Sequence, residues 1–170
     1  MEEIIQENDI QEETSSNEVT REDIDRLIRR HVYSSMAVGL IPIPVVDFLA
    51  VSGIQLNLVR KLSKIYNIPF SKESTKNIII SLVGGSIPAV TGQPVASSIK
   101  FIPIIGQSLG AVSMPLIAGA STFAVGKVFY RHFAAGGTFL TFDVEKAKAY
   151  YDEMFQKGKA LTTKMQVKTA

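Results

Sequence analysis

The chain has 170 residues, which is enough for one domain with a sizeable hydrophobic core, and its net charge of +2 creates no global field that would attract nucleic acid. It contains no cysteine, which excludes disulfides, thiolate nucleophiles and sulfur-ligated zinc. Hydrophobic residues make up 46% of the sequence and charged residues 20%, and the mean hydropathy is +0.18. A large core or a membrane must therefore take up an unusual amount of apolar surface.

The first ordered element follows an acidic segment. Residues 1–19 carry seven acidic residues and no basic residue, and we expect them to form a disordered tail without a cleavable signal peptide. Thr20 and Asp23 then have the spacing of a capping box, which predicts an amphipathic helix from Thr20 to Val38. One stripe at helical spacing holds the side chains expected to be buried: Ile24, Leu27, Ile28, His31, Val32 and Ser35.

Two more helices are expected before the most apolar part of the chain. Pro44 can open a helix that runs to about Tyr66, because the missing amide of a proline is not needed in the first turn. Ser71 or Ser74 can cap a third helix, which loosens at the two glycines beginning at Gly84.

The stretch from Ile78 to Gly126 contains one charged residue, Lys100, and we interpret it as an apolar helical hairpin rich in glycine and alanine. Its second arm, from Phe101, is long enough to cross a hydrocarbon layer, which needs about 20 mainly apolar residues, and Pro115 would kink that arm. Basic residues flank both ends of the hairpin, as expected if both ends lie on the cytoplasmic side of a membrane: Lys72, Lys76, Lys127 and Arg131.

The last predicted helix begins at Asp143, whose carboxylate can cap it, and includes Glu153 and Lys157 as an i, i+4 pair. Gly158 is suited to end this helix. Residues 159–170 contain lysines and no acids, and we expect a basic flexible tail. The ordered part would therefore be one all-α domain, a helical bundle over residues 20–158.

Small residues recur at four-residue intervals in the second arm of the hairpin. Such ridges let another helix backbone approach closely, in membrane bundles and in tight soluble bundles alike. The residues predicted to support this close packing are Gly106, Gly110, Ala118, Thr122 and Gly126.

The sequence contains no catalytic motif, and we expect neither a cofactor nor enzymatic activity. His31 and His132 lack metal-ligand spacing, so we interpret them as helix-surface or interfacial side chains. Asp47 lies in the first turn after Pro44, where a carboxylate favours a helix start. Because Asp47 and Gln55 are eight residues apart and share a helix face, a polar binding site remains the alternative.

Two segments share an outline 61 residues apart: IPIPVVDFLAVS at Ile41–Ser52 and IPIIGQSLGAVS at Ile102–Ser113. Each begins with Ile-Pro-Ile and ends with Ala-Val-Ser. We interpret them as two related helix–turn–helix units, the second almost without charge. Chance similarity between apolar helices is the alternative.

The stretch IPIPVVDFLAVSGIQLNLVRKLSKIYNI resembles the domain-of-unknown-function family 697, which occurs in YcjF-like membrane proteins and as an accessory domain of Era-like GTPases. The matching positions are Pro42, Pro44, Asp47, Gln55 and Tyr66, and in a similar second half Gly106, Gly110, Gly126, Gly136 and Gly137. The resemblance covers about Ile24 to Phe155 and departs at Val46, where the family often has glycine. It implies a helical, membrane-associated accessory domain without established catalytic residues.

Three hypotheses follow. The first is a non-enzymatic, membrane-associated helical scaffold of the bacterial cytoplasmic membrane, with its tails facing the cytoplasm and with membrane lipid, a GTPase or another protein, or a second copy of the chain as partners. The second is a soluble, cytoplasmic protein-interaction module. The third is a small-molecule carrier or enzyme that uses Asp47 and Gln55.

Overall fold

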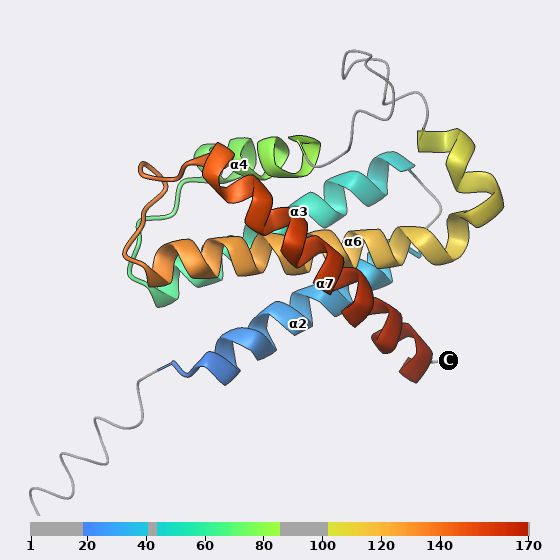
Figure 1. The fold of residues 1–170 in the computed structure, drawn as a ribbon, viewed down its shortest axis with the longest axis horizontal. Coiled ribbons are helices and arrows are strands. Elements are labelled where there is room, and N and C mark those ends of the chain that lie inside the picture. The colour runs from blue at the N-terminus through green and yellow to red at the C-terminus, as the bar shows by residue number, and fades with distance from the viewer. Residues whose placement is uncertain (1–18, 41–43, 86–101, 170) are drawn as a thin grey trace, which may run out of the picture.

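The computed structural model describes residues 19–40, 44–85 and 102–169, and for residues 44–48, 85, 102–113 and 169 it describes only the path of the helix. These ranges form five helices and no strand, so the predicted all-α fold is confirmed (Figure 1). The helices are α2 (Arg21–Val38), α3 (Pro44–Ile65), α4 (Lys72–Gly85), α6 (Ile102–Ala134) and α7 (Val144–Thr169).

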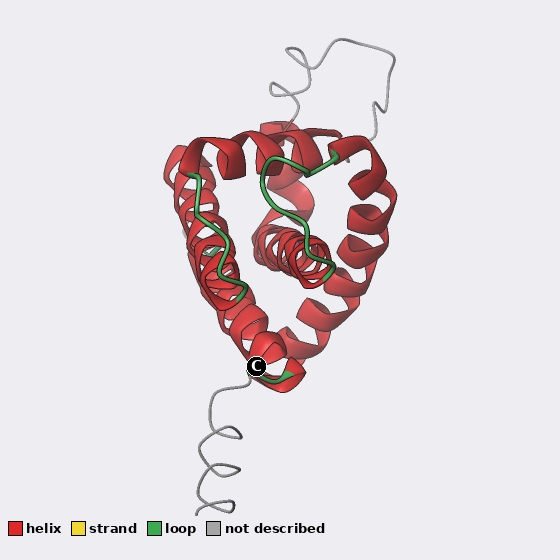
Figure 2. Cartoon of the chain, turned by 90° about the vertical axis from the view of Figure 1, so that its left-hand side faces the viewer, coloured by secondary structure: helices red, strands yellow, loops and turns green. Residues whose placement is uncertain are grey.

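The long helix α6 lies in the middle of the bundle and packs against α7, α2 and α3. Figure 2 shows it nearly end-on, with the other helices around it. Its apolar character thus serves a protein core over its C-terminal half, where the buried side chains include Ala120, Ala124, Val125, Phe129 and Phe133.

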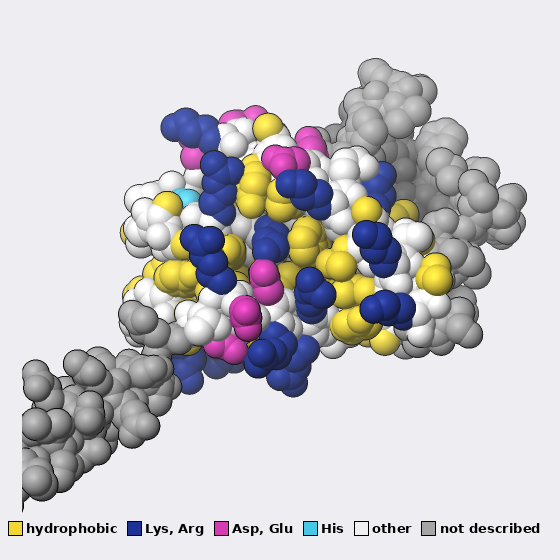
Figure 3. All heavy atoms as spheres, turned by 60° about the horizontal axis from the view of Figure 1, so that its bottom comes forward, with side chains coloured by type: hydrophobic (Ala, Val, Ile, Leu, Met, Phe, Trp, Pro, Cys, Tyr) yellow, Lys and Arg dark blue, Asp and Glu magenta, His cyan; other side chains and the backbone are white. Residues whose placement is uncertain are grey.

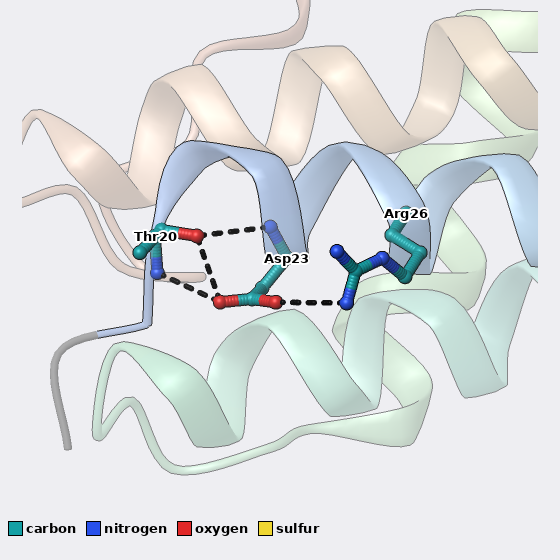
Figure 4. Close-up of polar contacts among 3 residues, drawn as sticks. All are labelled: Thr20, Asp23 and Arg26. Atoms are coloured by element: carbon teal, nitrogen blue, oxygen red, sulfur yellow. Dashed lines mark hydrogen bonds and ion pairs between the residues drawn. The ribbon is translucent and has the colours of Figure 1, made fainter. Parts of the chain in front are cut away.

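The start of α2 forms the predicted capping box (Figure 4). The backbone amide of Asp23 donates to Thr20 Oγ1 at 3.3 Å, and the backbone amide of Thr20 donates to Asp23 Oδ2 at 3.2 Å. Hydrogen bonds from Thr20 also lower the pKa of the Asp23 carboxyl. The helix then buries Ile24, Ile28, His31, Val32 and Ser35, five of the six residues in the predicted stripe.

Local signals also place the next two helix starts. Helix α3 begins at Pro44, and its predicted extent is confirmed to within a residue. Ser71 caps α4, because its hydroxyl accepts a hydrogen bond from the backbone amide of Ser74 at 3.3 Å. The two segments with the shared outline each lead into a helix, since α6 begins at Ile102.

The predicted end of the last helix is wrong. Helix α7 continues past Gly158 to Thr169, and the supposed flexible tail is helical over its described length. A Cβ atom at Gly158 would lie 2.9 Å from Ala120 Cα, so this glycine permits a close helix crossing instead of ending a helix. Beyond the crossing, Thr162 and Met165 are buried. Tertiary packing thus extends α7 by three turns.

The two described arms of the predicted apolar hairpin pack mainly against other helices rather than against each other. Helix α4 packs on α7 and α3, whereas α6 packs on α7, α2 and α3. Ile78, Ile79 and Leu82 are buried in the same core as α6, so this part of the apolar stretch packs against protein. Residues 86–101 of the stretch lie outside the described chain.

The end of the bundle at the C-terminus of α6 is closed by aromatic side chains. Gly136 has φ +82°, a left-handed conformation that ends α6 and turns the chain back over the core. Phe139, in the connection to α7, then packs edge-on against Phe133 with ring centroids 5.3 Å apart. Further rings in this cluster are Tyr66, Phe70, Phe129, Tyr130 and Phe142.

Candidate functional site

A buried polar junction lies where four helices meet. Gln55, on α3, is buried, and its Nε2 donates to Ser121 Oγ at 3.1 Å and to Thr122 Oγ1 at 3.3 Å, both on α6. Thr122 Oγ1 lies 2.7 Å from Ser35 Oγ on α2, and Ser121 Oγ lies 3.1 Å from the Tyr151 hydroxyl on α7. Each of these side chains is thus satisfied by another from a different helix.

The junction is suited to holding helices in register and contains no acid or base that titrates near neutral pH. Burial raises the pKa of Tyr151 to about 12, so its hydroxyl stays protonated and remains available for hydrogen bonding. Leaving a buried donor or acceptor without a partner costs about 1–3 kcal/mol, so this network favours one packing of the four helices.

Of the predicted polar pair Asp47 and Gln55, the structure describes the side chain of Gln55 only. Gln55 uses its amide hydrogens inside the core, whereas the side chain of Asp47 lies outside the described part of α3. The surroundings of Gly106 and Gly110 are likewise outside the described part of α6.

The other three predicted small residues are Ala118, Thr122 and Gly126, in the described half of α6. A Cβ atom at Gly126 would lie 3.0 Å from Leu58 Cδ2 and 3.1 Å from Ile28 Cγ1, so α2 and α3 both approach α6 there. Thr122 belongs to the polar junction, and Ala118 is half-buried. In this part of α6 the small residues Thr122 and Gly126 therefore contact other helices of the bundle.

His31 lies at the interface between α2 and α3. Its Nδ1 donates to the Leu27 carbonyl at 2.8 Å, so Nε2 accepts from Asn57 Nδ2 at 3.4 Å. Burial is the main cause that lowers the pKa of His31, and the cations of Lys61 and Arg30 act in the same direction. Over residues 19–40, 44–85 and 102–169 no group of three or more His, Cys, Asp or Glu side chains is placed to hold a metal ion.

A second feature is an open groove of about 590 Å³ between α2, α6 and the first half of α7, here called the basic groove. Four cationic side chains line it together with aromatic ones: Arg21, Lys127, Arg131 and Lys157 with Phe123, Tyr130 and Tyr150. Figure 3, which brings the lower edge of the Figure 1 view forward, shows Lys and Arg side chains interspersed with apolar ones on this side of the molecule.

The cations of the basic groove differ in their partners. Lys127 Nζ pairs with Asp25 Oδ1 at 2.6 Å, and Lys157 Nζ pairs with Glu153 Oε1 at 2.7 Å. The Arg131 guanidinium lies 4.4 Å from the centre of the Tyr150 ring. Two of the predicted flanking basic residues, Lys127 and Arg131, thus meet in the groove. The other two, Lys72 and Lys76, are on α4, outside it.

A third feature is the end of the bundle opposite the aromatic cluster, which exposes large apolar side chains. A Cβ atom at Gly39 would lie 2.9 Å from Pro115 Cα, so the end of α2 abuts the middle of α6. Leu40, Met114 and Ile117, which we call the apolar end, are 67%, 38% and 46% exposed. Figure 1 shows α6 bending away from the bundle on this side, where its internal proline removes a helix hydrogen bond.

Among the described residues, no helix combines the length and the apolar character needed to cross a bilayer.

Sequence reasoning missed the basic groove and the role of Gln55. The groove draws its lining from three helices distant in sequence, and only the i, i+4 spacing of Lys127 and Arg131 gave a local sign of it. The partners of Gln55 are 66 and 67 residues away in the chain. The hydroxyls of Ser121 and Thr122 inside an apolar run were the available signal.

Comparisons with known proteins identify a family and a relative of the chain. A family model described as a domain of unknown function (DUF697) matches residues 5–160. Magnetosome membrane protein 22 from Magnetospirillum gryphiswaldense is 39% identical to the chain over 145 residues, which are 85% of this chain and 74% of that protein. No solved structure matches. The matched region includes α2, α3, α4, α6 and the larger part of α7.

Proposed function

Because the chain belongs to the DUF697 family, we propose that it is a non-enzymatic, membrane-associated helical scaffold at the cytoplasmic face of a bacterial membrane. The name of its relative, a magnetosome membrane protein, supports attachment to a membrane. The polar junction supports a scaffold role, since its hydrogen bonds hold helices together and contain no group suited to acid–base chemistry near neutral pH.

The apolar end is the observation that carries the proposal. Leu40, Met114 and Ile117 expose large apolar side chains next to the bend in α6. Exposed apolar patches on a folded protein are typical of partner or membrane contacts. The chain from Ser86 to Ser113, which adjoins this end in sequence, has Lys100 as its only charged residue.

The packing of α6 limits which residues can contact the membrane. Ala120, Ala124 and Val125 are buried by protein, so the C-terminal half of the apolar stretch belongs to the core. Attachment therefore uses the apolar end and the chain between α4 and α6, while the bundle and both tails remain on the cytoplasmic side. Burying one Leu or Ile side chain in lipid contributes about 1.5–3 kcal/mol, so a few such residues suffice for reversible docking.

The scaffold would bind a protein partner through the outer face of α2. Arg26, Arg29 and Tyr33 are exposed there, and arginine and tyrosine are enriched in protein interfaces. A GTPase is the partner class that we propose, because the resembling domains accompany GTPases.

Fractionation of cells at physiological salt without an alkaline wash, followed by protease treatment of the membranes from the cytoplasmic side, tests the proposal. We expect the protein in the membrane fraction, with its acidic N-terminal segment cleaved by the protease. Recovery of all the protein in the soluble fraction, with none on the membranes, would contradict it. That result would favour a soluble interaction module, which the burial of the small residues Gly126 and Ala120 supports.

A further inference from the structure

The basic groove contains more positive charge than the described residues neutralise. Arg21, Lys127, Arg131 and Lys157 line it, and none of the described lining residues is acidic. Asp25 and Glu153 pair with the two lysines from the rim. Neither arginine has a carboxylate within ion-pair distance among residues 19–40, 44–85 and 102–169. The groove is therefore suited to an acidic occupant.

The aromatic side chains of the basic groove add a second property that an occupant must match. Phe123, Tyr130 and Tyr150 line the groove beside the cations, together with Met154. Arg131 already lies over Tyr150, which leaves its planar fork able to bind a carboxylate. An occupant that alternates carboxylates with aliphatic side chains would match both properties.

The chain itself contains such a segment, and we propose that residues 2–18 bind in the basic groove. This segment has seven acidic residues, no basic residue, and isoleucine at positions 4, 5 and 10. It joins the fold directly beside the groove, because Arg21 both lines the groove and begins α2. The inference does not depend on membrane attachment.

Because residues 2–18 are covalently joined to α2, weak contacts are sufficient to hold them in the basic groove. A short flexible connection gives a segment an effective concentration in the millimolar range at a nearby site. Exposed ion pairs contribute only about 0–1 kcal/mol each, so binding rests on several pairs together. Such binding is sensitive to salt, because the Debye length falls to a few ångströms at high ionic strength.

Cysteine cross-linking in the full chain tests the proposal, since the protein has no cysteine of its own. Asn8→Cys is combined either with Ala134→Cys, at the groove, or with Ser81→Cys, on α4; both positions are exposed. Eleven residues lie between Asn8 and Thr20, and this connection can reach about 40 Å, so an unbound segment would sample both positions.

We expect the Asn8–Ala134 disulfide to form about tenfold faster than the Asn8–Ser81 disulfide at low salt, and we expect about 0.5 M NaCl to abolish the difference. Replacing the acidic residues Glu7, Asp9, Glu12 and Glu13 with their amides should also abolish it, and these changes leave the folded helices untouched. Equal rates at the two positions, or a preference for Ala134 that persists after neutralisation, would overturn the proposal.

Discussion

The side-chain amide of Gln55 lies 3.1 Å from the hydroxyl of Ser121, and this hydrogen bond joins α3 to α6 inside the core. This contact helps to explain why Ser121 and Thr122 stand in the apolar run of α6. Ser121 and Thr122 meet polar partners from α2, α3 and α7 rather than lipid.

The first prediction concerns this junction. Gln55→Leu should lower the free energy of unfolding by about 1–3 kcal/mol, because the hydroxyls of Ser121 and Thr122 lose a buried donor. Urea unfolding measures the change, and a double-mutant cycle with Ser121→Ala should give a coupling energy of about 0.5–3 kcal/mol. Additive effects of the two changes would show that the amide and the hydroxyl are not coupled.

Two helical glycines should respond oppositely to alanine. Gly158→Ala places a Cβ atom against the backbone of Ala120, which cannot move aside, and should cost about 1–3 kcal/mol. Gly53→Ala is the matched control, since a Cβ there meets nothing within 4 Å, and it should stabilise the protein by about 0.5–1 kcal/mol. Thermal unfolding of both variants checks the sign. A neutral Gly158→Ala variant would argue against the crossing of α6 and α7.

The stability should depend on pH through His31. Because burial lowers the pKa of His31 in the folded state, the unfolded chain binds the proton first as pH falls below about 6.5. The free energy of unfolding should therefore be highest, as far as His31 is concerned, above that pH, and it should decrease toward pH 5. In the His31→Asn variant, whose amide can replace Nδ1 as a donor to Leu27, the decrease should be smaller. Urea midpoints at pH 5, 6 and 7 compare the two proteins, and equal pH slopes would contradict the expectation.

The sequence predicted the features that depend on neighbouring residues. The capping box at Thr20, the helix start at Pro44 and the cap at Asp143 each need contacts over three residues or fewer, and all are confirmed. Gly158 shows the limit of such reasoning. Its suitability as a helix end is a local property, but the close approach of Ala120 from another helix decides its role.

The apolar stretch could not be assigned to lipid or to core from composition alone, because both environments favour the same side chains. Packing separates the two: Val125 is buried, whereas Ile117, two turns earlier on α6, is 46% exposed. The basic groove was also inaccessible to pattern reasoning, since α2, α6 and α7 line it together.

Flotation of the purified protein with vesicles containing anionic lipid tests the membrane contact most directly. The wild-type protein should float with the vesicles, and Ile117→Lys should weaken the binding by about tenfold or more while leaving the fold intact. Leu140→Lys is the matched control, because Leu140 is 95% exposed but lies in the connection between α6 and α7, at the opposite end of the bundle. We expect this control to float like the wild type. Equal flotation of the two variants, or wild-type protein that stays below the vesicles, would contradict docking through the apolar end.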